Sequence, residues 1–72
     1  MRDLPIRGES IRLGQALKLS GLAESGGEAR ALVEDGAVTV NGEVETRRGR
    51  QLRHGDVVAV GDDALRIEAP VP

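Results

Sequence analysis

The sequence predicts an α+β domain in which two short helices pack on a small, mainly antiparallel and strongly twisted sheet of about four to five strands. Apolar residues recur at helical spacing in two segments between residues 13 and 36. After Gly36 the period changes to two, and an Asn-Gly pair at positions 41 and 42 marks a hairpin. Because strands follow helices instead of alternating with them, the class is α+β.

The first ten residues are expected to form an N-terminal arm, because Pro5 and Gly8 interrupt any regular period. The arm leaves room for an edge strand near Ile6. A first helix is then predicted over residues 13–20, since Gly21 is a natural C-terminal cap. Its inward stripe falls at positions i, i+3, i+4 and i+7 and consists of Leu13, Ala16, Leu17 and Ser20.

A second helix is predicted to begin at Ser25 and to end at Gly36. Ser25 and Glu28 stand three residues apart, which is the spacing of a capping box. The residues expected to face the core are Ala29, Leu32 and Val33.

The strands are predicted from alternation and from turn residues. Val38 and Val40 alternate with a polar residue, and the Asn-Gly pair at 41–42 suits a type I′ turn because both residues tolerate positive φ. Two further strands are expected at about 57–61 and 64–68, around the turn formed by residues 61–63.

The chain is long enough for one domain, which we assign to residues 11–68, with a C-terminal tail at 69–72. A domain of this size buries only about 60% of its unfolded surface. There is no cysteine, so disulfides and thiolate metal sites are excluded, and a reducing cytoplasm is the expected location. The longest apolar run, VVAV at 57–60, is too short to cross a membrane.

A cationic cluster interrupts an otherwise acidic chain. Residues 47–54 hold four arginines and no acid, although the whole chain has a net charge of −2. The four are Arg47, Arg48, Arg50 and Arg53. Arginine binds phosphate through two parallel hydrogen bonds, and Gly49 lets the segment bend. We therefore expect a cationic loop that binds phosphates.

Catalytic and metal sites are not expected. The sequence contains no nucleophile elbow, phosphate-binding P-loop or metal-ligand motif. The single histidine, His54, precedes Gly55 and reads as a turn residue, and the Asp62-Asp63 pair suits a turn. We expect no enzymatic activity, no cofactor and no small-molecule substrate.

Several motifs in the right order resemble a known family, the alpha-L RNA-binding motif first described in ribosomal small-subunit protein S4. The resemblance covers residues 11–60. The matching residues are Arg12-Leu13, Gly21-Leu22-Ala23-Glu24-Ser25, Leu32-Val33, Gly36 with Val38, Val40, Asn41 and Gly42, and Gly55-Asp56-Val57-Val58. Small freestanding bacterial members of the YbcJ type share the stretch ETRRGR at 45–50.

This resemblance implies RNA binding by the helix pair together with the cationic loop. Many family members carry an RNA-facing arginine directly after the serine that caps the second helix. Here Gly26 and Gly27 stand at that place, and their bare backbone amides can approach a phosphate. Lys18 and Arg30 replace part of the missing charge, and Arg12 opens the first helix.

The expected partner is structured RNA, ribosomal or transfer, bound by a monomer. The chain has no Phe, Trp or Tyr on which single-stranded bases could stack. One alternative is a DNA-binding helix-turn-helix protein, although the second helix offers only Arg30 as a cation. Another is an interaction or carrier module of the ubiquitin-like kind, although the tail EAPVP lacks terminal glycines.

Overall fold

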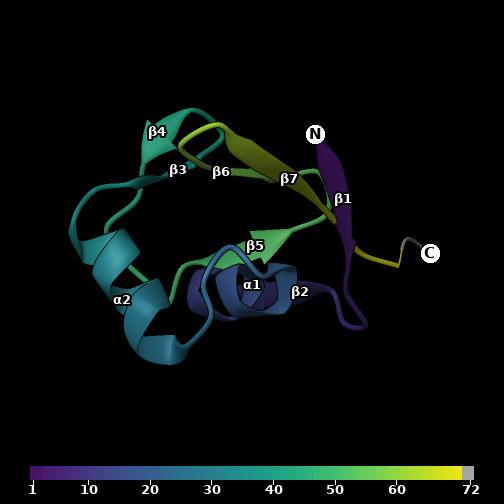
Figure 1. Cartoon of the computed structure of the whole chain (residues 1–72). Coiled ribbons are helices and arrows are strands. Elements are labelled where there is room, and N and C mark those ends of the chain that lie inside the picture. The colour runs from purple at the N-terminus through teal and green to yellow at the C-terminus, as the bar shows by residue number, and fades with distance from the viewer. Residues whose placement is uncertain (71–72) are drawn as a thin grey trace.

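The computed structural model describes residues 1–70 of the 72-residue chain, with two helices below a twisted sheet (Figure 1). The elements follow one another in the order β1 (Arg2–Pro5), β2 (Ser10–Arg12), α1 (Leu13–Ser20), α2 (Gly26–Glu34), β3 (Val38–Val40), β4 (Glu43–Val44), β5 (Gln51–Arg53), β6 (Val57–Val60) and β7 (Asp63–Glu68).

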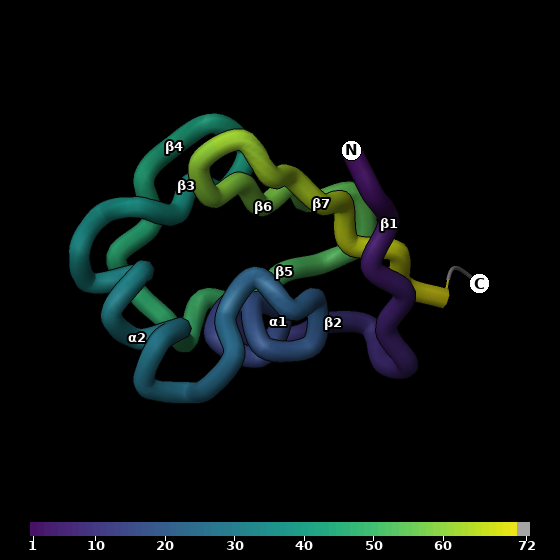
Figure 2. Tube along the Cα trace, in the orientation of Figure 1, coloured from purple at the N-terminus to yellow at the C-terminus, as the bar shows by residue number. Residues whose placement is uncertain are grey.

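Seven strands form two sheets. The larger sheet has the order β1-β7-β6-β3-β4, in which β1 runs parallel to β7 and the other neighbours are antiparallel. The tube in Figure 2 shows β1 running beside the end of β7. The smaller sheet is the antiparallel pair β2 and β5, with Ile11 opposite Leu52.

The α+β class, the two helices and a main sheet of about four to five strands are confirmed, whereas the separate two-stranded sheet was not predicted. The prediction lacked the pairing of β2 with β5, and it placed Arg53 in a loop although this residue lies on β5. Both strands have three residues and pair across about forty positions of sequence. A local alternation pattern carries no signal for such a pairing.

The two helices begin and end where the local signals placed them. Gly21 caps α1 in a left-handed conformation (φ 82°), and its N–H donates to the carbonyl of Lys18 at 3.1 Å. At the start of α2, the hydroxyl of Ser25 accepts a hydrogen bond from the backbone N–H of Glu28 at 3.1 Å. This bond stabilises the first turn by satisfying an N–H that has no partner within the helix.

The Asn-Gly hairpin is confirmed, with positive φ at both Asn41 (53°) and Gly42 (86°). The Asn41 side chain also ties this turn to the start of β6. Its amide nitrogen donates to the Asp56 carboxylate at 3.1 Å, and its oxygen accepts from the N–H of Val57 at 2.9 Å. Asn41 therefore has two structural roles, one in its backbone and one in its side chain.

The core lies between the helices and the sheets and is wholly aliphatic. Its largest fully buried side chains are Leu13, Leu17, Leu52, Leu65, Ile67, Val33, Val38, Val40 and Val58. Leu32, which was expected on the core-facing stripe of α2, is only partly buried at the margin. Leu52 on β5 belongs to this core, so the strand that follows the cationic segment is held firmly in place.

Beyond β7, Ala69 is buried, and its N–H donates to the Nδ1 atom of His54 at 3.1 Å. Residues 71 and 72 of the predicted tail lie outside the described residues. Neither α1 nor α2 has the length and apolar character needed to cross a membrane.

Candidate nucleic-acid interface

The cationic segment connects β4 to β5, and we call residues 45–50 the arginine loop. A turn within it brings the N–H of Arg50 to the carbonyl of Arg47 at 3.2 Å. The loop is short and is fixed at one end by Leu52, which is fully buried on β5.

The backbone of the arginine loop caps the N-terminus of α1. The first N–H groups of a helix have no partner within the helix, and Arg12 at the N-cap position supplies no side-chain bond. Instead, the N–H of Leu13 donates to the carbonyl of Arg50 at 2.8 Å, and that of Gly14 donates to the carbonyl of Arg48 at 2.9 Å. The loop and α1 are thereby joined through main-chain atoms alone.

Gly14 makes this close approach possible. A Cβ atom at this position would lie 3.1 Å from Cγ of Arg48 and 3.6 Å from its carbonyl oxygen. A glycine inside a helix costs up to about 1 kcal/mol relative to alanine, so its presence here has a packing reason. It lets the Arg48 side chain lie across the first turn of α1.

The carboxylate of Glu45 binds two of the four arginines. Its Oε2 accepts from the backbone N–H and from Nε of Arg47, at 3.0 and 3.3 Å, and its Oε1 accepts from the guanidinium of Arg50 at 3.1 Å. The Glu45 side chain is only 8% exposed. The hydrogen bonds from Arg47, more than that from Arg50, lower the pKa of Glu45 to about 2. The cationic run is therefore partly neutralised by an acid that stands just before it in the sequence.

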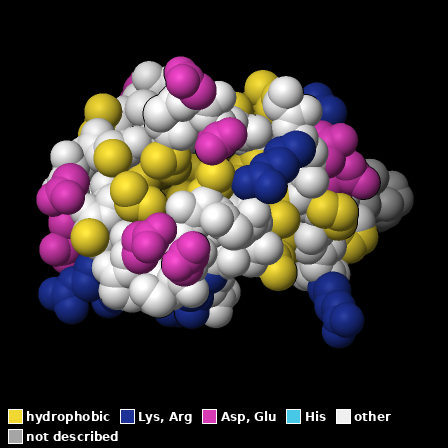
Figure 3. Space-filling view, viewed as in Figure 1, with side chains coloured by type: hydrophobic (Ala, Val, Ile, Leu, Met, Phe, Trp, Pro, Cys, Tyr) yellow, Lys and Arg dark blue, Asp and Glu magenta, His cyan; other side chains and the backbone are white. Residues whose placement is uncertain are grey.

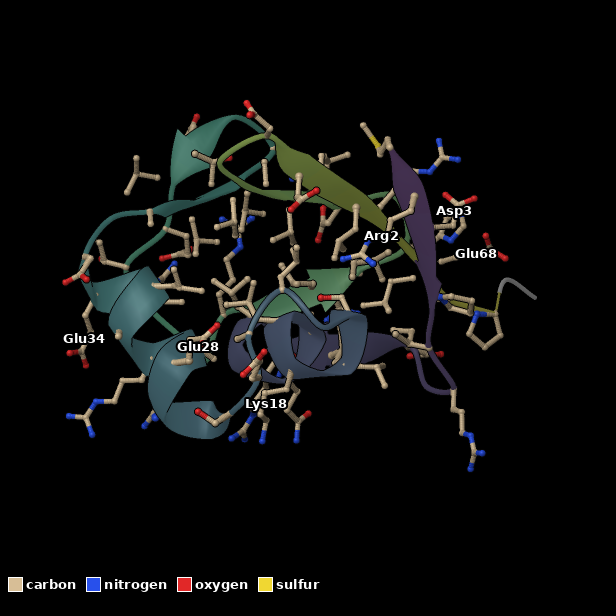
Figure 4. The ribbon with its side chains drawn as sticks, viewed as in Figure 1. Arg2, Asp3, Lys18, Glu28, Glu34 and Glu68 are labelled. Carbon is tan, nitrogen blue, oxygen red and sulfur yellow. The ribbon has the colours of Figure 1, made fainter. Side chains whose placement is uncertain are left out.

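A hollow of about 370 Å³ opens between α1, the start of α2 and the arginine loop, and we call it the cationic groove. Its lining residues are Arg12, Gly14, Gln15, Lys18, Gly26, Ala29, Arg48 and Gly49. Three of them are cations, each from a different part of the fold, and none is an acid. Lys18 extends from the lower side of α1, away from the larger sheet (Figure 4).

The start of α2 forms one wall of the groove. Gly26 is exposed, and a Cβ atom there would meet nothing within 4 Å. Gly27 follows it in the first turn of the helix. The position is therefore open both to an approaching anion and to a longer side chain.

The other predicted site residues lie outside the groove. Arg30 is bound to Glu34 at 2.8 Å, and this bond raises the pKa of Arg30. Arg53 is exposed on β5, and its backbone N–H donates to the carboxylate of Asp56 at 2.7 Å. Four of the nine predicted residues thus gather in one groove, namely Arg12, Lys18, Gly26 and Arg48.

Sequence reasoning missed Glu45, Gly14 and Gln15. For Glu45 a signal existed, because a carboxylate two residues from one arginine and five from another can reach both in a tight loop. For Gly14 the signal was a glycine within a helical pattern. Gln15 carried no signal, since an exposed glutamine on a helix is ordinary.

Charge is distributed unevenly over the surface. In the space-filling view, acidic groups are spread over most of the visible face, and cationic groups lie along the lower edge and also at the centre and upper right (Figure 3). The cationic groups of the lower edge lie on the side on which Lys18 emerges (Figures 3 and 4).

Comparison with known proteins places this fold in a family. The family described as S4 domain matches residues 4–68. The "Probable ribosome maturation protein RlbA" of Bacillus subtilis (strain 168) is 48% identical over 52 residues, which make up 72% of this chain and 73% of that protein. YbcJ of Escherichia coli (strain K12), by its name a candidate RNA-binding protein, is 34% identical over 59 residues, which make up 82% of this chain and 84% of that protein.

A solved structure has the same fold. The crystal structure of the 30S ribosomal protein S4e from Thermoplasma acidophilum superposes with a TM-score of 0.62 at 22% identity over 81% of this chain. The chain spans about a third of the length of that protein, since the match covers 31% of it. The match over residues 4–68 and the two relatives above 30% identity lead to one conclusion: this chain is a member of the S4 domain family.

Proposed function

We propose that this protein binds structured RNA, ribosomal or transfer, by holding backbone phosphates in the cationic groove. The observation that carries the proposal is the groove itself, in which Arg12, Lys18 and Arg48 converge without an acid among the lining residues. Arginine and lysine supply the charge that phosphates require, and the open start of α2 adds backbone N–H groups.

Family membership supports the same reading. The chain belongs to the S4 domain family, and its S4 domain is an RNA-binding module. The printed names of the two relatives concern ribosome maturation and RNA binding. We infer that the present chain acts in the cytoplasm on ribosomal RNA or on an RNA that meets the ribosome.

The preference for folded RNA follows from what the side chains can do. Unstructured strands are commonly bound by stacking bases on aromatic rings, and the sequence has no such ring. Duplex RNA is recognised through its shape, its phosphates and its 2′-hydroxyls. A cationic groove suits that form of recognition.

The DNA-binding alternative is weakened by the surface of α2. A recognition helix enters the major groove with side chains that donate to base edges. The single cation of α2, Arg30, is already bound to Glu34, and Glu28 stands in the first turn. This helix would bring negative charge to the bases.

Competition binding tests the proposal. We expect a labelled stem-loop RNA to be displaced by duplex or stem-loop RNA at lower concentration than by poly-U. Crosslinking in cells, followed by sequencing of the attached nucleic acid, would then identify the natural RNA. Poly-U competing as well as stem-loop RNA would contradict shape recognition, and recovery of no RNA above background would refute RNA binding.

A further inference from the structure

We propose that Glu45 is a positioning residue for RNA binding: its buried carboxylate fixes the arginine loop so that Arg48 is held in the cationic groove. This inference rests on the proposed function, because the groove is the surface it serves. It gives Arg47 and Arg50 a role different from that of Arg48. The first two hold the loop, and the third contacts the ligand.

The contacts of Glu45 are those of an anchor. The residue is tied to β3 through its own backbone, because its N–H donates to the carbonyl of Val38 at 3.0 Å. Its side chain then receives Arg47 and Arg50 from both sides of the turn. A carboxylate so enclosed is stable only while those two arginines remain bound to it.

The anchor is connected to the groove through main-chain bonds. Arg50 bonds to Glu45 by its side chain and to the N–H of Leu13 by its carbonyl, at 2.8 Å. Arg48 lies between the two anchored arginines, and its carbonyl accepts from Gly14 at 2.9 Å. Release of Arg47 and Arg50 would therefore leave the segment that carries Arg48 held to α1 by these two main-chain bonds alone.

If Glu45 acted only through its charge, removing it would have the opposite effect on RNA binding. An experiment can therefore distinguish the positioning role from a pure effect of charge. Removing an acid near a phosphate-binding surface makes the protein less negative and should strengthen RNA binding. Removing the anchor should weaken binding despite the more favourable charge. The sign of the change decides between them.

The test compares Glu45→Gln with the matched control Glu43→Gln. Glu43 is an exposed acid on β4, two residues away, so both variants change the net charge equally. We expect Glu43→Gln to bind stem-loop RNA as tightly as the wild type or slightly more tightly. We expect Glu45→Gln to bind roughly three- to tenfold more weakly, with a smaller slope of log affinity against log salt, because about one phosphate contact is lost.

A second variant separates positioning from loss of the fold. Glu45→Asp keeps the charge but draws the carboxylate back by one methylene, so it should also weaken binding and lower the salt slope. Circular dichroism fixes a temperature at which each variant is folded, and binding is measured there. A merely structural role would leave the salt slope of the folded protein unchanged.

The possible outcomes are distinct. If both Glu45 variants bind like Glu43→Gln while Arg48→Ala weakens binding, the positioning role is refuted and the groove stands. If the wild type itself binds no structured RNA, the proposed function fails instead.

Discussion

Replacing the three groove cations with alanine should remove most of the salt-dependent affinity for RNA. The variant is Arg12→Ala, Lys18→Ala and Arg48→Ala, and all three side chains line the same hollow. Each phosphate neutralised on a duplex contributes up to about 0.9 to the slope of log affinity against log salt. The slope should therefore fall by roughly 2 to 3 if all three side chains contact phosphate.

The fold should survive this change, for reasons that the structure provides. Arg12 pairs with β5 through its backbone, and the carbonyl of Arg48 supports α1, and alanine retains both of these backbone roles. Lys18 stands in the last turn of α1, where a cation favours the helix dipole by about 0.3 to 1 kcal/mol. Arg47 and Arg50 are left in place because their removal would leave the carboxylate of Glu45 buried without partners.

The assay is RNA affinity at several salt concentrations, with thermal unfolding as the control for folding. A matched variant removes three arginines elsewhere, at positions 2, 7 and 66, all of them exposed and outside the groove. It has the same net charge as the groove variant. Equal losses of slope in the two variants would show that affinity follows overall charge, and the reasoning about the groove would be refuted.

Three further predictions concern single features of the fold. Gly26→Arg should strengthen RNA binding and raise the salt slope by up to about 0.9, because the site is open to a side chain at the groove wall; an unchanged slope would exclude phosphate from the start of α2. Replacing Asn41-Gly42 with Ala-Ala should destabilise the protein by about 1 to 3 kcal/mol, measured by thermal unfolding, with little change in the salt slope of the folded protein; an unchanged unfolding midpoint with lost RNA binding would refute this structural role. The pKa of Glu45 is lowered from its ordinary value of 4.5 to about 2, so its stabilising effect is present above about pH 4.5 and is lost as the pH falls toward 2. Unfolding from pH 2 to 6 should therefore show the stability advantage of wild type over Glu45→Gln shrinking below about pH 4.5, and a constant difference would contradict the cause assigned here.

Local signals predicted the helices and the central hairpin correctly because their determinants are close in sequence. Gly21 and Ser25 fix helix ends through bonds within a few residues, and Asn41-Gly42 fixes a turn through its own dihedral angles. None of these features depends on a distant partner.

The parts that sequence reasoning missed depend on distant contacts. The pairing of β2 with β5 and that of β1 with β7 join segments about 40 and 60 residues apart, and neither appears in a local period. The hydrogen bonds of Glu45 to Arg47 and Arg50 distinguish these two from the other arginines of a run that looks uniform in the sequence. Counting charges locates the cationic segment, but it does not show which of its arginines can contact a ligand.

The main-chain cap of α1 affects which positions of the arginine loop can be changed, in engineering or in evolution. Because the carbonyl of Arg48 supports the helix and its side chain faces the groove, the identity of the side chain can change while the support remains. A library of all amino acids at position 48 would therefore sample ligand preference on a constant scaffold. Position 45 offers no such freedom, since its side chain is part of the scaffold itself. Within six residues, the loop combines one position open to new specificities with another that is not.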